Sequence, residues 1–299
     1  MLSGQLSVKD KHVVITGGSQ GLGAEMGRQL VLKGASSVTL IARTETKLKA
    51  VVNTIKEVRV SDKQVVSYIA ADVSVYKECE DAVRSLEFAP DLVFLCAGSS
   101  IPKLLLDLTP KELEQGVAVN YNTALFFSHA VFKRMATSPA VPYARHIVFC
   151  SSVLALYPFI GYGQYAPSKA AIRSLSDIMR HEGLPFNIKV ACVYAGNFAS
   201  EGFAEEEKTK PVITREIEGP SSPITVEKCA EIVLWWLDRG YQTIYTDMIG
   251  WFLGAGSLGF SPRVAGLLQI VVALLLAIIG PIYVLICERD IKKFFKKQQ

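Results

Sequence analysis

The sequence predicts an α/β domain built on a doubly wound parallel sheet, followed by a hydrophobic membrane segment near the C-terminus. Short apolar runs rich in β-branched residues alternate with helical patterns, as expected for parallel strands buried on both faces. A glycine-rich loop directly follows the first of these runs. Residues 264–287 carry no charge, and this length exceeds the roughly 20 residues that cross a bilayer.

The apolar runs indicate six strands and a candidate seventh. They cover residues 12–16, 37–42, 64–70, 91–96, 146–150 and 188–194, with 242–246 as the seventh. Two helix starts are well marked. Thr109, Pro110 and Glu112 form the pattern of a capping box, and a helix over 225–239 is expected to end at Gly240.

Composition narrows the class of partner. The net charge is +4, but residues 288–299 alone contribute +3, so the folded part is nearly neutral and no nucleic-acid partner is expected. Six cysteines without metal-site spacing fit a reducing compartment, and no signal peptide precedes the first strand. We therefore expect a domain over 1–247, a membrane-associating segment over 248–287 and a basic cytosolic tail over 288–299.

The loop TGGSQGLG over 16–23 predicts a Rossmann-type dinucleotide site. Its glycines allow a tight turn and a close approach to a pyrophosphate at the N-terminus of the following helix. A purely structural glycine turn is the alternative. The expected cofactor-binding residues in this loop are Gly17, Ser19, Gln20, Gly21 and Gly23.

Basic residues after the second strand favour NADPH as the cofactor. Arg43 stands where NAD-binding domains usually carry an acid, and its guanidinium suits a 2′-phosphate. Ser19 and Lys47 are expected to add further donors. Asp72, after the third strand, is placed to bond the adenine, and Gly98 follows the fourth strand where the backbone passes close to the cofactor.

The stretch SSVLALYPFIGYGQYAPSKAA carries the predicted chemistry. Tyr165 and Lys169 share one helix face, so the ammonium can lower the pKa of the phenol and prepare it to protonate a ketone oxygen. Ser152 is expected to hydrogen-bond the same oxygen, and Asn120 to hold a water that feeds the proton relay. The alternative is that these are merely packed polar residues.

The loop over 16–23, CAG (96–98), Asn120, Ser152 and YAPSK (165–169) together resemble the short-chain dehydrogenase/reductase family over roughly residues 8–250. The resemblance implies hydride transfer with NAD(P) by a Ser-Tyr-Lys-Asn site, and a homo-oligomer, often a dimer. Three features depart from the family pattern: Cys96 replaces the usual Asn, Ala195 stands where proline is common, and Asn122-Thr123 replaces a common glycine.

A closer likeness is to the members of this family in fungi that reduce the 3-keto group of a long-chain keto-amine lipid. It is carried by NFASEGFAEEEKTKP (197–211), IEGPSSPI (217–224) and the hydrophobic C-terminus. It implies an NADPH-dependent enzyme of sphingolipid synthesis at the endoplasmic reticulum membrane, with the catalytic domain in the cytosol. The alternatives are a membrane-bound reductase of a steroid or retinoid carbonyl, and a catalytically silent nucleotide-binding scaffold.

The charged stretch after the sixth strand is expected to form a substrate lid over about 201–223, with a solvated surface excursion as the alternative. Within it the acidic run 205–207 is either a solvated surface, which the pattern favours, or a group that attracts the ammonium of a substrate.

The terminal KKQQ is similar to a dilysine retrieval signal read in the cytosol, or is simply a basic flank. A single crossing cannot leave both ends of the chain in the cytosol. The chain is therefore expected to turn back near Gly280-Pro281, unless 248–260 forms a second embedded element.

Overall fold

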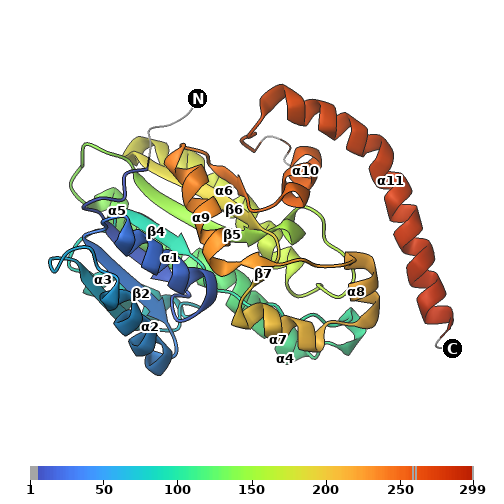
Figure 1. Cartoon of the computed structure of the whole chain (residues 1–299), viewed down its shortest axis with the longest axis horizontal. Coiled ribbons are helices and arrows are strands. Elements are labelled where there is room, and N and C mark those ends of the chain that lie inside the picture. The colour runs from blue at the N-terminus through green and yellow to red at the C-terminus, as the bar shows by residue number, and fades with distance from the viewer. Residues whose placement is uncertain (1–5, 258, 260, 298–299) are drawn as a thin grey trace.

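The core of the protein is a seven-stranded, all-parallel sheet, seen in a computed structural model that describes residues 6–257, 259 and 261–297. The strand order is β3-β2-β1-β4-β5-β6-β9. Figure 1 labels β2, β4, β5 and β6 of this sheet, with helices packed on it. Every predicted strand is present, including the seventh. The strands are β1 His12–Thr16, β2 Ser37–Ala42, β3 Val65–Ala70, β4 Leu92–Leu95, β5 Arg145–Ser152, β6 Ile188–Ala195 and β9 Thr243–Tyr245.

Helices cover both faces of this sheet, which explains why its strands are continuously apolar. All four residues of β4 are buried, and Phe94 and Phe149 have no exposed surface. One face packs against α1 (Gly21–Leu32), α2 (Glu45–Glu57) and α9 (Val226–Asp238). The other packs against α3 (Tyr76–Ser85), α5 (Thr123–Thr137) and α6 (Ala166–Glu182). The doubly wound α/β prediction is therefore confirmed.

The predicted helix starts have the expected caps. At α4 (Pro110–Val117) the Thr109 hydroxyl accepts a hydrogen bond from the Glu112 amide at 3.3 Å. The Thr109 amide donates in return to the Glu112 carboxylate at 2.9 Å, which completes the capping box. At α9 the Thr225 hydroxyl accepts from the Lys228 amide at 3.2 Å.

The segment expected to form a lid contains two short helices, α7 (Glu201–Thr209) and α8 (Val212–Glu218). A two-stranded pair, β7 (Phe198–Ala199) with β8 (Ile224–Thr225), closes its base. Lys210 lies between the helices with a 1 % exposed side chain, and contacts both Glu207 of α7 and Glu218 of α8. The turn-forming composition of 203–223 gives no sign of these two helices. They are joined by a buried cluster of ion pairs, and contacts between separate segments cannot be read from local composition.

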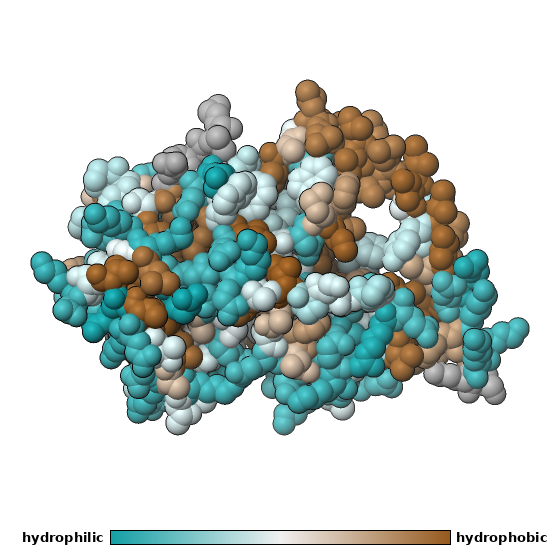
Figure 2. Space-filling model, viewed as in Figure 1, coloured by the Kyte–Doolittle hydropathy of each residue, from teal (hydrophilic) through white to brown (hydrophobic). Residues whose placement is uncertain are grey.

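Two helices follow the sheet. They are α10 (Met248–Ser257) and α11 (Gly266–Lys296), and the residues of α11 carry most of the large exposed apolar side chains of the C-terminal part (Figure 2). Among the described residues α11 is the one helix long and apolar enough to cross a membrane, with a mean hydropathy of 3.0 in a window only 11 % buried. So much exposed apolar surface marks a membrane-associating segment.

The expected turn at Gly280-Pro281 is wrong, because α11 continues through both residues. A proline inside a helix removes one backbone hydrogen bond, whereas reversing the chain within lipid would expose many more backbone groups. Gln269, the polar residue of the apolar stretch, has no exposed surface. Its Oε1 accepts hydrogen bonds from the amides of Val264 and Ala265 at 3.0 and 3.4 Å, so it caps the start of α11. Leu258, Phe260 and the terminal Gln298-Gln299 lie outside the described residues.

Candidate active site

A cavity of about 860 Å³ opens at the carboxyl ends of the strands, where the strand order reverses between β1 and β4. This switch point is where open parallel sheets bind ligands. The cavity is lined by every predicted site residue except Asn120. They are Gly17, Ser19, Gln20, Gly21, Gly23, Arg43, Lys47, Asp72, Gly98, Ser152, Tyr165 and Lys169.

The glycine loop has the tight turn expected of a dinucleotide site. Side chains at its glycines would clash with the protein's own backbone. A Cβ on Gly17 (φ +70°) would lie 2.7 Å from the Ala97 amide, and one on Gly23 would lie 2.4 Å from the Gly17 carbonyl oxygen. The loop thus folds tightly against the end of β4 and exposes the N-terminus of α1 to the cavity. The free backbone N–H groups at a helix N-terminus are suited to binding a pyrophosphate.

The remaining cofactor residues lie on the rim. Arg43 and Lys47 are exposed, and the Lys47 ammonium donates to Gln20 at 2.8 Å and to Glu201 of α7 at 2.9 Å. The Asp72 carboxylate accepts from the Ser74 amide at 2.9 Å and from its hydroxyl at 2.7 Å. Lys47 therefore links the glycine loop to α7, a contact that the sequence does not indicate.

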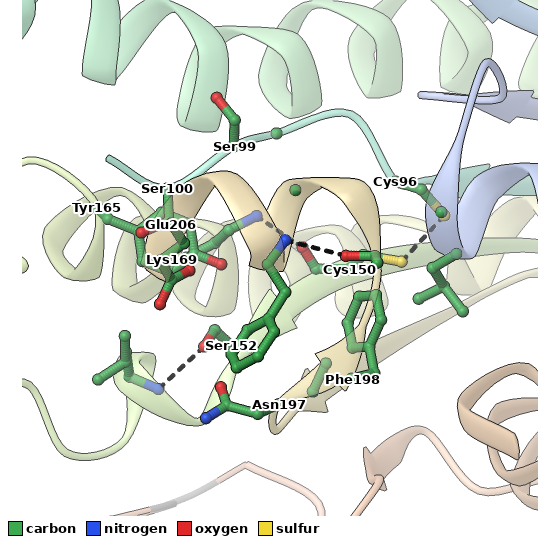
Figure 3. Close-up of a pocket in the computed structure, with 18 of the residues that line it drawn as sticks. Cys96, Ser99, Ser100, Cys150, Ser152, Tyr165, Lys169, Asn197, Phe198 and Glu206 are labelled. Carbon is green, nitrogen blue, oxygen red and sulfur yellow. Dashed lines mark hydrogen bonds between the residues drawn. The ribbon is translucent and has the colours of Figure 1, made fainter. Parts of the chain in front are cut away.

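Three of the four predicted catalytic side chains, Ser152, Tyr165 and Lys169, converge from two neighbouring elements (Figure 3). Ser152 ends β5, and its hydroxyl accepts from the Leu154 amide at 3.2 Å. Tyr165 precedes α6, while Lys169 lies one turn into that helix with 5 % of its surface exposed. The Ser151 hydroxyl donates to the Lys169 carbonyl at 2.9 Å and fixes α6 against β5.

The expected low pKa of the Tyr165 phenol is not present in this structure. Burial raises the pKa of Tyr165, the charge of Glu206 raises it further, and the hydroxyl of Ser152 offsets part of the rise. The Lys169 ammonium lies 5.4 Å from the centre of the Tyr165 ring and donates to the Cys150 carbonyl at 3.0 Å. Burial also lowers the pKa of Lys169, and its ammonium is engaged by the Cys150 carbonyl.

Asn120 lies beside the cavity, in a π-helical turn over Ala118–Asn122. It is 1 % exposed, and its Oδ1 accepts from the Ser99 amide at 3.0 Å. A Cβ on Gly98 would lie 3.1 Å from this oxygen and 3.2 Å from the Lys169 ammonium. Gly98 therefore lies between the side chains of Asn120 and Lys169, where a larger residue would crowd both. The role of Asn120 in holding a water remains a prediction.

Two thiols meet at the floor of the cavity. Cys96, at the end of β4, lies 3.2 Å from Cys150 of β5, sulfur to sulfur (Figure 3). The hydrogen bond between them raises the pKa of Cys96 and lowers that of Cys150. Cys96, which replaces the asparagine usual in the family, therefore packs against a second cysteine.

Several lining residues are not among the predicted site residues. Glu206 comes from α7 and Asn197 from the turn between β6 and β7, while Ile249 and Leu253 come from α10. Tyr283 of α11 also lines the cavity, and its ring centroid is 6.0 Å from that of Tyr157. Of these, Asn197 and Glu206 lie in the stretch 197–211 that carries the likeness to the fungal enzymes, and Glu206 also belongs to the acidic run 205–207. The favoured interpretation of that run, a solvated surface, is wrong for Glu206 because its side chain is only 15 % exposed.

This chain belongs to the short-chain dehydrogenase family, whose model matches residues 11–211. It is accordingly an oxidoreductase with a nicotinamide cofactor, in agreement with the loop and the Ser-Tyr-Lys group described above. Fungal relatives extend the similarity over the whole chain. The 3-ketodihydrosphingosine reductase of Debaryomyces hansenii is 46 % identical over 98 % of this chain and 92 % of its own length.

Two further 3-ketodihydrosphingosine reductases resemble the chain. That of Yarrowia lipolytica is 46 % identical over 97 % of this chain and 79 % of its own, and that of Saccharomyces cerevisiae is 35 % identical over 98 % of each. Among solved structures, a short-chain dehydrogenase from Sphingobium yanoikuyae in complex with NADPH has a TM-score of 0.68 at 21 % identity. It covers 79 % of this chain and 87 % of its own. At this identity the likeness concerns the fold.

Proposed function

We propose that this protein is an NADPH-dependent reductase that converts the 3-keto group of 3-ketodihydrosphingosine to the alcohol. The observation that carries the proposal is the convergence of Ser152, Tyr165 and Lys169 in a cavity whose walls include apolar residues of α10 and α11. Identity of 35–46 % over nearly the whole chain to reductases of that name supports it.

The chain's residues fit the cofactor. The glycine loop would hold the pyrophosphate at the start of α1, and Arg43, Lys47 and Ser19 on the rim would hold the 2′-phosphate that distinguishes NADPH from NADH. Asp72 would bond the adenine. When bound, the dinucleotide supplies the hydride that the carbonyl carbon receives.

The protein's part in the chemistry is to bind and protonate the ketone oxygen. The Ser152 hydroxyl donates a hydrogen bond to that oxygen, and the Tyr165 phenol gives it a proton as negative charge develops there. Ketone, hydride and proton together give the secondary alcohol. Lys169, buried beside Tyr165, favours the phenolate that remains, and Asn120 holds the water through which the phenol recovers its proton.

The apolar end of the cavity suits a lipid chain. Ile249, Leu253 and Tyr283 line it from the two helices that follow the sheet, and α11 is the membrane-associating helix. A long alkyl chain can therefore extend from the catalytic residues towards the bilayer without crossing water. We propose that the catalytic domain lies on the cytosolic face of the endoplasmic reticulum, where NADPH is available, and we expect a homo-oligomer there.

The test is substrate-resolved consumption of NADPH by the purified full-length protein in detergent or liposomes. We expect turnover with 3-ketodihydrosphingosine and little with retinal or a 3-ketosteroid. Preference for either of the last two would replace the proposed substrate by a retinoid or steroid. NADPH binding without turnover of any ketone would instead indicate a nucleotide-binding scaffold.

A further inference from the structure

Glu206 is a carboxylate inside the catalytic cavity that the reduction of a simple ketone does not require. It lies on α7 of the lid, and Figure 3 places it with Tyr165. The Tyr162 hydroxyl donates to it at 2.6 Å, and Tyr162 is itself 2 % exposed with its ring centroid 6.2 Å from that of Tyr165. The carboxylate is therefore fixed in place next to the catalytic phenol.

The charges around Glu206 do not balance. The Lys210 ammonium is shared by three carboxylates: it lies 3.5 Å from Glu206 and 2.7 Å from Glu218, and it also contacts Glu207. Arg215 adds a second cation at 3.6 Å, but on Glu207. Three acids thus face two bases, and burial raises the pKa of Glu206. A further cation arriving through the cavity would stabilise this carboxylate.

The same charge opposes the reduction of a neutral ketone. Glu206 raises the pKa of the Tyr165 phenol, which makes it a weaker proton donor. Negative charge also develops on the ketone oxygen during hydride transfer, close to the carboxylate. A substrate that carries its own cation next to the carbonyl would remove both penalties when it binds.

We propose that Glu206 binds the ammonium group of the substrate and selects ketones that carry a protonated amine on the carbon next to the carbonyl. The inference rests on the proposed function, because 3-ketodihydrosphingosine has this arrangement. With its ketone oxygen on Ser152 and Tyr165, its ammonium points to Glu206 and its alkyl chain to Tyr283. Steroid and retinoid carbonyls lack the cation and leave the carboxylate unpaired beside the reacting oxygen.

The experiment compares the amine substrate with its N-acetyl derivative, which has the same ketone and chain but no charge. The kcat/KM of each is measured for the full-length enzyme, for Glu206→Gln and for Glu205→Gln, at a pH where the amine is protonated. Glu205 is the matched control, since it is next in sequence and 69 % exposed. We expect Glu206→Gln to lose roughly 100-fold on the amine, the scale of a desolvated charge pair, and to keep or exceed the wild-type kcat/KM on the neutral N-acetyl ketone, because the opposing charge is gone.

The loss of selectivity, rather than of activity, is the decisive measurement. Equal losses on both ketones in Glu206→Gln, or unchanged preference for the amine, would overturn the inference and leave the proposed function intact. If Glu206→Gln does not fold, Glu206→Asp keeps the charge and must keep a preference for the amine over the N-acetyl ketone. A wild-type enzyme that reduces neutral ketones but not the amine would refute the proposed function itself.

Discussion

Tyr165 and Tyr162 are three residues apart, yet their replacement by phenylalanine should affect different properties. Tyr165→Phe should mainly lower kcat, and Tyr162→Phe should mainly lower the thermal stability. In Tyr165→Phe the proton donor is lost, so kcat should fall by about 10²–10⁴-fold, the usual contribution of a positioned acid. The stability of Tyr165→Phe should change little, since its hydroxyl contributes at most a hydrogen bond with Ser152, worth about 0.5–1.5 kcal/mol.

Tyr162→Phe removes a different kind of interaction. Its hydroxyl is buried and donates to the Glu206 carboxylate at 2.6 Å, and such bonds to charged groups contribute about 1.5–3 kcal/mol. At about 2–4 °C per kcal/mol, Tyr162→Phe should lower the Tm by roughly 3–12 °C. Its chemistry should be affected less than that of Tyr165→Phe, because Tyr162 does not contact the ketone oxygen.

The assay pairs single-turnover NADPH oxidation with thermal unfolding in the same detergent. A Tyr165→Phe enzyme that retains more than about a tenth of the wild-type rate would refute the role of the phenol as proton donor. Equal drops in Tm for the two variants would show that the 2.6 Å hydrogen bond from Tyr162 to Glu206 contributes no more to stability than the hydroxyl of Tyr165 does.

Three further predictions concern the cofactor, pH and the membrane. Arg43→Asp should raise the KM for NADPH at least about 10-fold and improve use of NADH, and an unchanged preference would remove Arg43 from the cofactor site. Burial, with the charge of Lys189, lowers the pKa of His146 from 6.5 to about 4. The folded state then binds fewer protons than the unfolded one between these values, so stability should fall as pH drops through this window. Thermal unfolding at several pH values should show a smaller fall in His146→Gln, and parallel curves would contradict this. Ile278→Lys with Ile282→Lys places two charges on the exposed apolar surface of α11, at about 2.5–3.5 kcal/mol each near the centre of a bilayer. Vesicle flotation should then be lost, and a variant that still floats would show that another surface binds the membrane.

Much of the fold could be predicted because its determinants are local. Continuous apolar runs identify strands buried on both faces, and the Thr109 capping box begins α4 as its residues require. The glycine loop and the Tyr-Lys pair also lie within single stretches of chain. What the sequence does not reveal depends on contacts between distant segments. Lys210 joins α7 to α8 through acids on both helices, and Glu206, which also contacts Lys210, lines the cavity from α7.

The pKa of Tyr165 illustrates the same limit. Sequence spacing brings Lys169 near the phenol, but it does not reveal that the ammonium donates to the Cys150 carbonyl or that Glu206 lies on the other side. The path of α11 through Gly280-Pro281 likewise depends on the apolar surroundings of the whole helix. A local breaker signal does not contain that information.

The connection between the sheet and the C-terminal helices is very short. β9 ends at Tyr245 and α10 begins at Met248. Both residues between them are anchored: the Thr246 hydroxyl accepts from the Gly196 amide at 2.9 Å, and the Asp247 carboxylate from the Gly250 amide at 2.6 Å. Because both residues of this connection are anchored, α10 cannot move independently of the sheet, and Ile249 and Leu253 keep fixed positions in the cavity wall. The apolar side of the cavity is therefore rigid, so a hydrophobic reactant meets the same surface at every turnover.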